Sequence, residues 1–301
     1  LPPQLAWNVK HTGTVPCDSW SVTAVYRAEM APVLKLAAGF AAIENGTVQL
    51  RGIVDEYDVE LGSGGLMVTL SGRGYAARLL DNESRPVTYE QVTLRELIRC
   101  HAEPYGIACG ASADLRSTVP YTAGAGVSQW KVISEFCRTY GSFLPRFAKT
   151  GELLAVPEKD DGKRIVIGDG SPVLECRIRE DHYGVLTEAL VIDKKQNVSY
   201  SVQNPEMIAK GGQCRRVVYT PGRSTWDAMR YTGEYQISQS RRDAAAVTVK
   251  LPGSFGAFPG DRVALKLERL GLAGLYRAAE TENRFSAREG AVMIWILKEC
   301  E

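Results

Sequence analysis

GRGYAARLLDNESRPVTYEQVTLRELIRCHAEPYG, residues 72–106, marks the point where a β-rich pattern gives way to helices. Small and apolar residues lead to a polar break at Asn82–Pro86. Thr93 and Glu96 then form a capping box, in which side chains satisfy the free N–H groups of a first helical turn. Apolar positions follow at helical spacing, at Leu94, Leu97, Ile98 and His101. The stretch therefore predicts a helix that begins at Thr93 and ends near Tyr105-Gly106.

Residues 1–85 carry the pattern of short β-strands. Apolar and polar residues alternate through Trp20–Tyr26, Val48–Val54 and Leu66–Leu70, as in strands that bury one face. Asn45-Gly46 separates two strand-like segments and tolerates the positive φ angles of a tight hairpin. Several short strands at this spacing predict a small barrel or sandwich.

Residues 86–172 predict an α+β domain that interrupts the strands. A second helix is expected from Ser128, a plausible N-cap, to Gly141, a C-cap candidate. Its apolar face consists of Trp130, Ile133, Phe136, Cys137 and Tyr140. Residues 143–147 and 153–156 then predict a hairpin that packs on the helices.

Residues 173–301 return to a β pattern with one inserted helix. The strand candidates are Val185–Ile192, Val198–Val202, Arg215–Tyr219, Val247–Leu251, Val263–Leu267 and Val292–Leu297. The helix is expected to begin at Ser224 as N-cap. Phe258-Pro259-Gly260-Asp261 has Pro and Gly at the two central positions of a type II turn, which predicts a positive φ at Gly260.

Composition bounds the function. The chain has 301 residues, enough for two or three domains, with 45% hydrophobic and 24% charged residues, as in folded globular proteins. Its 36 basic and 35 acidic residues give a net charge of +1, which does not favour a dedicated nucleic-acid binder. Pro32, Lys35 and Gly39 interrupt the most apolar run, so no membrane span is expected. The first residues lack the pattern of a signal peptide.

No residue pattern indicates a catalytic, metal or cofactor site. The seven cysteines are scattered, which favours free thiols and synthesis in a reducing compartment. Cys100, His101 and Cys109 match no zinc spacing, so we expect a pair of helix residues and a loop thiol. Cys137 lies on the apolar face of a helix and is expected to be a core thiol rather than a nucleophile.

An acidic run precedes the Gly72 stretch. Glu56, Asp58 and Glu60 lie on one face if residues 55–60 form a strand, because side chains alternate there. Such a row fits a calcium site, a carboxylate pair for glycoside hydrolysis, or a solvated acidic face. The run lacks the glycine-bearing spacing of a calcium loop, and we expect the solvated face.

These motifs, in their order along the chain, resemble the tail hub (baseplate hub) proteins of contractile-tailed phages and prophages of Gram-positive bacteria. The likeness is to the Mu-like tail protein, or late control protein D, type. It rests on the Gly72–Gly106 block, on Gly52–Glu56 before it, and on Ser128–Gly141 and Pro259-Gly260-Asp261 after it. It covers nearly the whole chain.

The resemblance implies two small tail-tube-like β-barrels, residues 1–85 and 173–301, separated by the α+β domain of residues 86–172. It implies a homotrimer whose six barrels form a pseudo-sixfold ring between the tail tube and a threefold spike. The implied partners are the chain itself, the tail tube protein, the spike protein and, as a further candidate, the tape measure protein, with no membrane and no specific nucleic acid.

The implied location is the baseplate of a virion tail, after synthesis in the bacterial host cytoplasm. The acidic run then lines or flanks a charged channel. A peptidoglycan or glycan hydrolase and a carbohydrate-binding module stay as alternatives.

Overall fold

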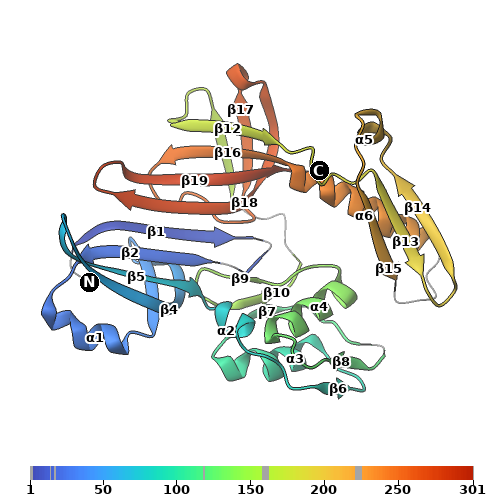
Figure 1. Ribbon diagram of the computed structural model, residues 1–301, viewed down its shortest axis with the longest axis horizontal. Helices are drawn as coiled ribbons and strands as arrows, with labels where there is room; N and C mark the ends of the chain where they lie inside the picture. The colour runs from blue at the N-terminus through green and yellow to red at the C-terminus, as the bar shows by residue number, and fades with distance from the viewer. Residues whose placement is uncertain are drawn as a thin grey trace. The chain divides into compact units, whose positions relative to one another are not determined.

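The computed structural model describes residues 3–13, 15–16, 18–117, 119–157, 163–220 and 226–300. They divide into two compact units. Unit 1 consists of Leu1–Ile165, Lys250–Arg262 and Ala278–Trp295, and unit 2 of Val166–Val249, Val263–Arg277 and Ile296–Glu301. The fold is mainly β, with helices between the sheets (Figure 1). In the described part of the chain, no helix is long and apolar enough to cross a membrane.

Unit 1 is built on an antiparallel sheet from the start of the chain. Its first strands are β1 (Gln4–Thr12), β2 (Ser19–Val25), β3 (Gly39–Glu44), β4 (Thr47–Gly62) and β5 (Gly65–Gly74). The order is β1-β2-β5-β4-β3, and the late strand β18 (Leu272–Ser286) pairs with β1 from Ala6↔Ser286 to Thr12↔Glu280. A strand from near the end of the chain therefore pairs with the first strand of this sheet.

Strand β18 was absent from the sequence prediction, and its composition explains why. Thr281 and Asn283, each 0% exposed, occupy the buried face of the strand where apolar residues are expected. The alternation that reveals a half-buried strand is therefore missing. No closed barrel is detected among the described strands, so the two barrels stay a prediction.

The core of the first sheet follows the predicted alternation. It consists of Val9, Trp20, Val22, Ala24, Leu34, Leu50, Val68 and Leu70, with Phe255 packed against it. The Trp20 indole stacks on Phe40 at 3.6 Å between ring centroids and donates to the backbone oxygen of Ile53 at 3.0 Å. Trp20 thus joins three strands of this sheet.

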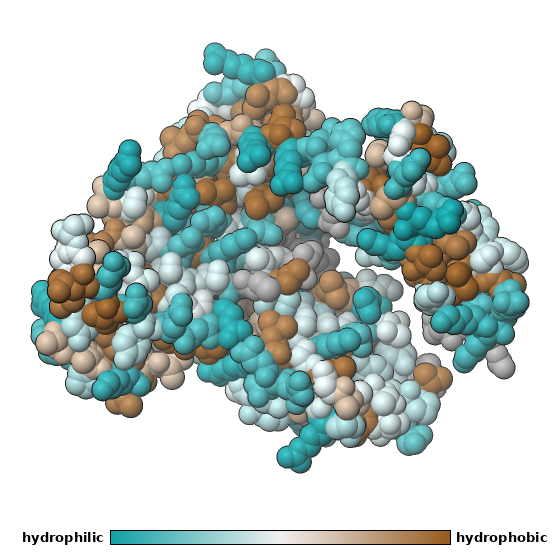
Figure 2. All heavy atoms as spheres, in the orientation of Figure 1, coloured by the Kyte–Doolittle hydropathy of each residue, from teal (hydrophilic) through white to brown (hydrophobic). Residues whose placement is uncertain are grey.

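Helix α1 (Ala31–Leu36) corrects the prediction of an all-β stretch before residue 80. Pro32 fits its first turn, where the missing N–H leaves no bond unmade. Leu34 packs into the core, whereas Val33 and Leu36 are 69% and 83% exposed. Figure 2 shows the hydrophobic residues that gather around this helix.

The α+β part of unit 1 has a core of its own. Its helices are α2 (Ala77–Leu80), α3 (Leu94–His101) and α4 (Gln129–Gly141). A two-stranded sheet pairs β6 (Val87–Tyr89) with β8 (Tyr121–Ala123). A three-stranded sheet has the order β7 (Cys109–Ser112), β10 (Leu153–Ala155) and β9 (Arg146–Phe147). The capping box of Thr93 and Glu96 is confirmed. Helix α3 ends at His101, and a 3-10 turn (Glu103–Tyr105) then leads to Gly106 at φ 72°.

The end of α4 differs from the prediction by one residue. Ser128 is the N-cap, as predicted, and accepts a bond from the backbone N–H of Lys131. The left-handed C-cap is Ser142, at φ 55°, and not Gly141. A Cβ at Gly141 would lie 2.5 Å from the Phe143 ring. Packing against that ring, rather than capping, therefore explains this glycine.

Unit 2 contains a three-stranded sheet with a helix on one face. Strands β14 (Val198–Gln203), β13 (Glu188–Asp193) and β15 (Arg215–Thr220) lie in that order beside α6 (Trp226–Ala244), with α5 (Pro205–Ala209) after β14. The unit also holds β12 (Glu175–Glu180) and most of β11 (Arg164–Gly168). Strands β16 (Ala245–Pro252), β17 (Arg262–Leu267), β18 and β19 (Gly290–Glu299) contribute residues to both units. The predicted cap Ser224 lies outside the described residues.

The predicted turn at Gly260 is confirmed. Gly260 has φ 100°, and the backbone N–H of Asp261 donates to the oxygen of Phe258 at 3.0 Å, which closes the turn.

Gly260→Val is expected to lower the free energy of unfolding by about 1–2 kcal/mol, because a β-branched residue resists positive φ. Urea denaturation measures it, with Gly260→Asn as the control, since Asn tolerates this region better. Equal midpoints for the Val variant and the wild type contradict the prediction.

Candidate functional site

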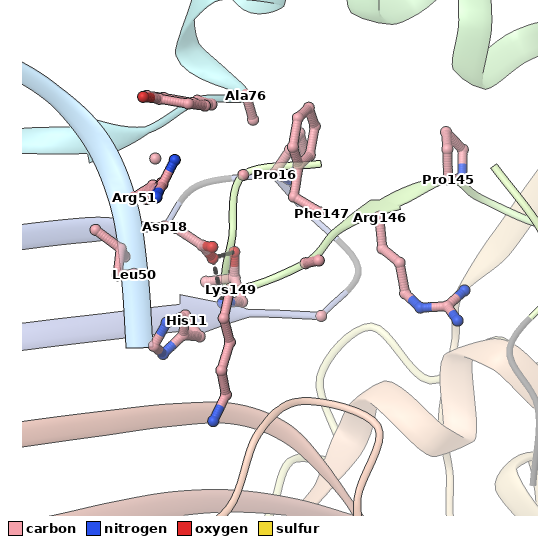
Figure 3. A pocket seen from close by; sticks show the side chains of 16 residues that line it. His11, Pro16, Asp18, Leu50, Arg51, Ala76, Pro145, Arg146, Phe147 and Lys149 are labelled. Carbon is pink, nitrogen blue, oxygen red and sulfur yellow. Dashed lines mark hydrogen bonds between the residues drawn. The ribbon is translucent and has the colours of Figure 1, made fainter. Parts of the chain in front are cut away.

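A small cavity lies where the first sheet meets the turn between β9 and β10, and its lining residues all belong to unit 1 (Figure 3). Its volume is about 20 Å³, room for about one water molecule. Its titratable and charged lining residues include His11, Asp18, Arg51, Arg146 and Lys149. They come from β1, the residue before β2, β4, and the β9–β10 segment.

His11 is buried in a single tautomer. The ring is 1% exposed, and Nε2 lies 2.9 Å from the backbone oxygen of Gln49. A carbonyl only accepts, so Nε2 carries the hydrogen and Nδ1 is left as an acceptor. Nδ1 has no partner among the described residues. Burial lowers the pKa of His11 to about 4; the Gln49 bond opposes this shift and the charge of Lys149 adds to it.

Gln49 connects His11 to the β9–β10 turn. Its backbone oxygen accepts from His11, and its side-chain oxygen accepts from Lys149 Nζ at 2.8 Å. The backbone N–H of Arg51 donates to the backbone oxygen of Lys149 at 3.1 Å. The Phe258 ring lies against both His11, at 4.9 Å between centroids, and the Lys149 ammonium, at 5.2 Å. The turn is therefore fixed to the sheet by polar and aromatic contacts together.

Asp18 closes the other side of the cavity. Its Oδ1 accepts from the backbone N–H of Thr12 at 2.8 Å, and its backbone oxygen accepts from Gly74 at 2.8 Å. Burial raises the pKa of Asp18 to about 6, by more than the Thr12 bonds lower it. Such burial of titratable groups is a sign of function or of a structural joint.

The geometry favours the structural joint. The cavity is too small for an organic substrate, and the polar groups described around it largely bond to one another. No sequence pattern points to His11, Asp18 or Lys149, because they lie far apart along the chain and match no motif. Only the fold brings them together.

The structure places His101 in a hydrogen-bonded network. Its Nδ1 donates to Gln129 Oε1 at 2.5 Å, and its Nε2 accepts from the Tyr89 hydroxyl at 3.0 Å. Cys100 and Cys109 are exposed. Both ring nitrogens of His101 are thus engaged within the protein.

Cys137 lies in the core, as predicted from its helix face. It is 0% exposed, and burial raises its pKa to about 12. A thiol with such a pKa is protonated at neutral pH and is a poor nucleophile. Cys17 lies outside the described residues.

The acidic run lies on the exposed end of β4. Glu56, Asp58 and Glu60 face Ser71, Thr69 and Met67 of β5, so they share one face as predicted. Asp55 lies at a β-bulge and pairs with Arg73 at 2.7 Å. Glu56 accepts from the Ser71 hydroxyl at 2.9 Å.

A second cavity, of about 230 Å³, lies within unit 2. Half of its lining residues are charged, among them Glu180 and Glu206, and His182 also lines it. Glu206 pairs with Lys210 at 3.0 Å and also with Arg241. The Arg241 pair joins α5 to α6, whereas the Lys210 pair stays within α5 and its C-cap. All three side chains are exposed, so these pairs engage the Glu206 carboxylate but contribute little stability.

Comparison with solved structures decides the fold class. The tail protein from Neisseria meningitidis MC58 matches with a TM-score of 0.81 at 15% identity, over 98% of this chain and 92% of that chain. The prophage MuSo2 43 kDa tail protein from Shewanella oneidensis matches with a TM-score of 0.78 at 15% identity, over 98% and 93%. This chain has the fold of phage tail proteins.

The fold is also similar to that of a type VI secretion system component. The E. coli c3393 protein, described as a component of the type VI secretion system with structural similarity to the T4 tail proteins gp27 and gp5, matches with a TM-score of 0.58 at 8% identity, over 99% of this chain and 74% of that chain. No family model and no curated protein sequence matches this chain. The likeness therefore lies in the fold.

Proposed function

We propose that this chain is a structural hub protein of a phage-type baseplate, which links a sixfold tail tube to a threefold spike. Three copies form a ring, and two similar β modules in each copy imitate sixfold symmetry. The partners are further copies of the chain, the tail tube protein and the spike protein, with the tape measure protein as an additional partner. The protein resides in the virion tail after synthesis in the host cytoplasm.

The main support for this proposal is that the fold matches two tail proteins over nearly the full length of this chain and of each of them. Fold alone does not determine function, but a structural role depends on overall shape more than on a catalytic site. The likeness to c3393, a protein compared with gp27 and gp5, favours the baseplate end of the tail. The three-part division at residues 85 and 172 belongs to the same proposal.

One face of the first sheet suits the inner wall of such a ring. The cross-strand row Glu56, Ser71, Ser21, Asn8 and Arg284 passes through β4, β5, β2, β1 and β18 and is polar at every position. The opposite face holds the apolar core. A polar face of this width can line an aqueous passage, with the acidic run at its border.

The hub proposal predicts a trimer with a central channel. Light scattering at increasing concentration should give a mass that approaches three chains, and electron micrographs should show rings with pseudo-sixfold appearance. Addition of a tail tube protein should raise the trimer fraction, because it supplies further contacts. A chain that forms only dimers, or trimers without a channel, contradicts the proposal.

A structural role also predicts that the chain does not degrade cell walls. Purified protein should leave a peptidoglycan suspension turbid under conditions in which an added lysozyme clears it. The hydrolase alternative requires the acidic run. Clearing by the wild type that is lost in Glu56→Gln or Asp58→Asn would establish that alternative.

A further inference from the structure

Among the described strands, none pairs with the outer edge of β4 over its second half. Strand β5 pairs with β4 as far as Gly62↔Gly65, but β3 covers the other edge only from Thr47 to Ile53. Beyond this, the last backbone hydrogen bond described on that edge runs from the Val54 N–H to the Ala38 oxygen. Residues 55–62 therefore present a row of backbone groups to which another strand can add.

The two faces of this free segment differ in chemistry. Glu56, Asp58 and Glu60 are exposed on one face. Tyr57, Val59 and Leu61 alternate with them and are 40%, 38% and 79% exposed. A strand that docks here thus meets acidic groups on one side and apolar groups on the other.

Strand β12 in unit 2 has the complementary pattern. It is the last strand of its sheet, with β16 as its only neighbour in the described strand order. Arg177 and Arg179 are exposed on one face, and Ile178, 50% exposed, lies between them on the other. Arg179 pairs with Asp181 at 2.9 Å, but both side chains are exposed, and such pairs are weak.

We propose that the free edge of β4 in one copy pairs with β12 of the next copy, which rests on the ring proposed above. Any register that places Arg177 opposite one acidic residue of β4 places Arg179 opposite the next, because both strands alternate with a period of two. Ile178 then meets Tyr57 or Val59.

Like charges oppose the pairing of two β4 edges or two β12 edges. The contact is therefore head-to-tail, as a closed ring of identical copies requires.

Charge reversal of the full-length chain tests this contact. Asp58→Lys with Glu60→Lys, and separately Arg177→Glu with Arg179→Glu, should each weaken self-association about tenfold or more at low salt, since like charges then face each other. The chain with all four substitutions restores opposite charges and should recover association. Arg95→Glu with Arg99→Glu, on the exposed face of α3, is the matched control and should associate like the wild type. Sedimentation equilibrium measures each association constant.

The outcomes separate this contact from the ring itself. If the wild type forms trimers and both charge-reversed double variants associate equally well, the β4–β12 contact is contradicted. The hub proposal then still stands. The β4–β12 contact is also contradicted if both double variants lose association and the variant with all four substitutions does not recover it. A wild type that stays monomeric at millimolar concentration in low salt contradicts both the contact and the ring.

Discussion

Gly72→Ala is expected to lower the free energy of unfolding by about 3 kcal/mol, at the upper end of the usual cost of overpacking, because the new methyl group has no room. A Cβ at Gly72 would lie 2.0 Å from the backbone oxygen of Ile53 and 3.0 Å from the Trp20 indole. Neither neighbour can move freely, since Trp20 Nε1 donates to that same Ile53 oxygen and the indole stacks on Phe40. The strands β4 and β5 must therefore separate at this point.

Urea denaturation followed by tryptophan fluorescence measures the loss. Gly52→Ala should act similarly, because its Cβ would lie 2.3 Å from the Arg73 oxygen. Gly124→Ala is the matched control: nothing lies within 4 Å of its added Cβ, and a change within about 0.5 kcal/mol is expected. A Gly72→Ala chain as stable as the control variant contradicts the account.

The same two glycines explain why the sequence was informative here. Gly52 and Gly72 begin two of the four segments on which the family resemblance rests, and they lie on neighbouring strands under the Trp20 ring. The alternation of apolar residues also predicted β2, β4 and β5, and the capping box at Thr93 fixed the start of α3. Local patterns with a local physical cause were therefore predictable.

Features that depend on distant residues were not. Strand β18 joins the first sheet through polar residues such as Asn283, whose Oδ1 accepts from the backbone N–H of Phe255 at 2.6 Å. The cavity combines His11, Asp18 and Lys149, which no spacing rule connects. The predicted C-cap of α4 was one residue too early. Gly141 is a glycine because the Phe143 ring leaves no room for a side chain there, and tertiary packing of this kind has no local sequence signal.

His11 and Asp18 are expected to oppose each other in the pH dependence of stability. The pKa of His11 falls on folding from 6.5 to about 4, so its contribution is fully present above pH 6.5 and is lost as pH falls through 4. The pKa of Asp18 rises on folding from 3.8 to about 6, so its contribution is fully present below pH 3.8 and is lost as pH rises through 6. Between about pH 4 and 6 the two slopes nearly cancel.

Single substitutions should expose each slope. Asp18→Asn keeps an oxygen that can accept from Thr12 and removes the charge. Relative to the wild type, its free energy of unfolding should increase by about 2–3 kcal/mol between pH 4 and pH 7. His11→Gln keeps a donor for the Gln49 oxygen and removes the titration. For His11→Gln, the free energy of unfolding relative to the wild type should rise by a similar amount as pH falls from 6.5 to 4. This pH trend is opposite to that of Asp18→Asn.

Urea denaturation at half-unit pH steps measures both differences, and the difference from the wild type removes the contribution of the other carboxylates. His182→Gln is the control, because His182 is exposed and pairs only weakly with Glu180 at 3.6 Å. The double variant should show nearly the pH profile of the wild type, since the folding of the wild-type pair takes up no net proton in this range. The opposed titrations are contradicted if, for both single variants, the free energy of unfolding relative to the wild type stays constant from pH 4 to pH 7. Constant differences would mean that each group has the same pKa in the folded and the unfolded chain.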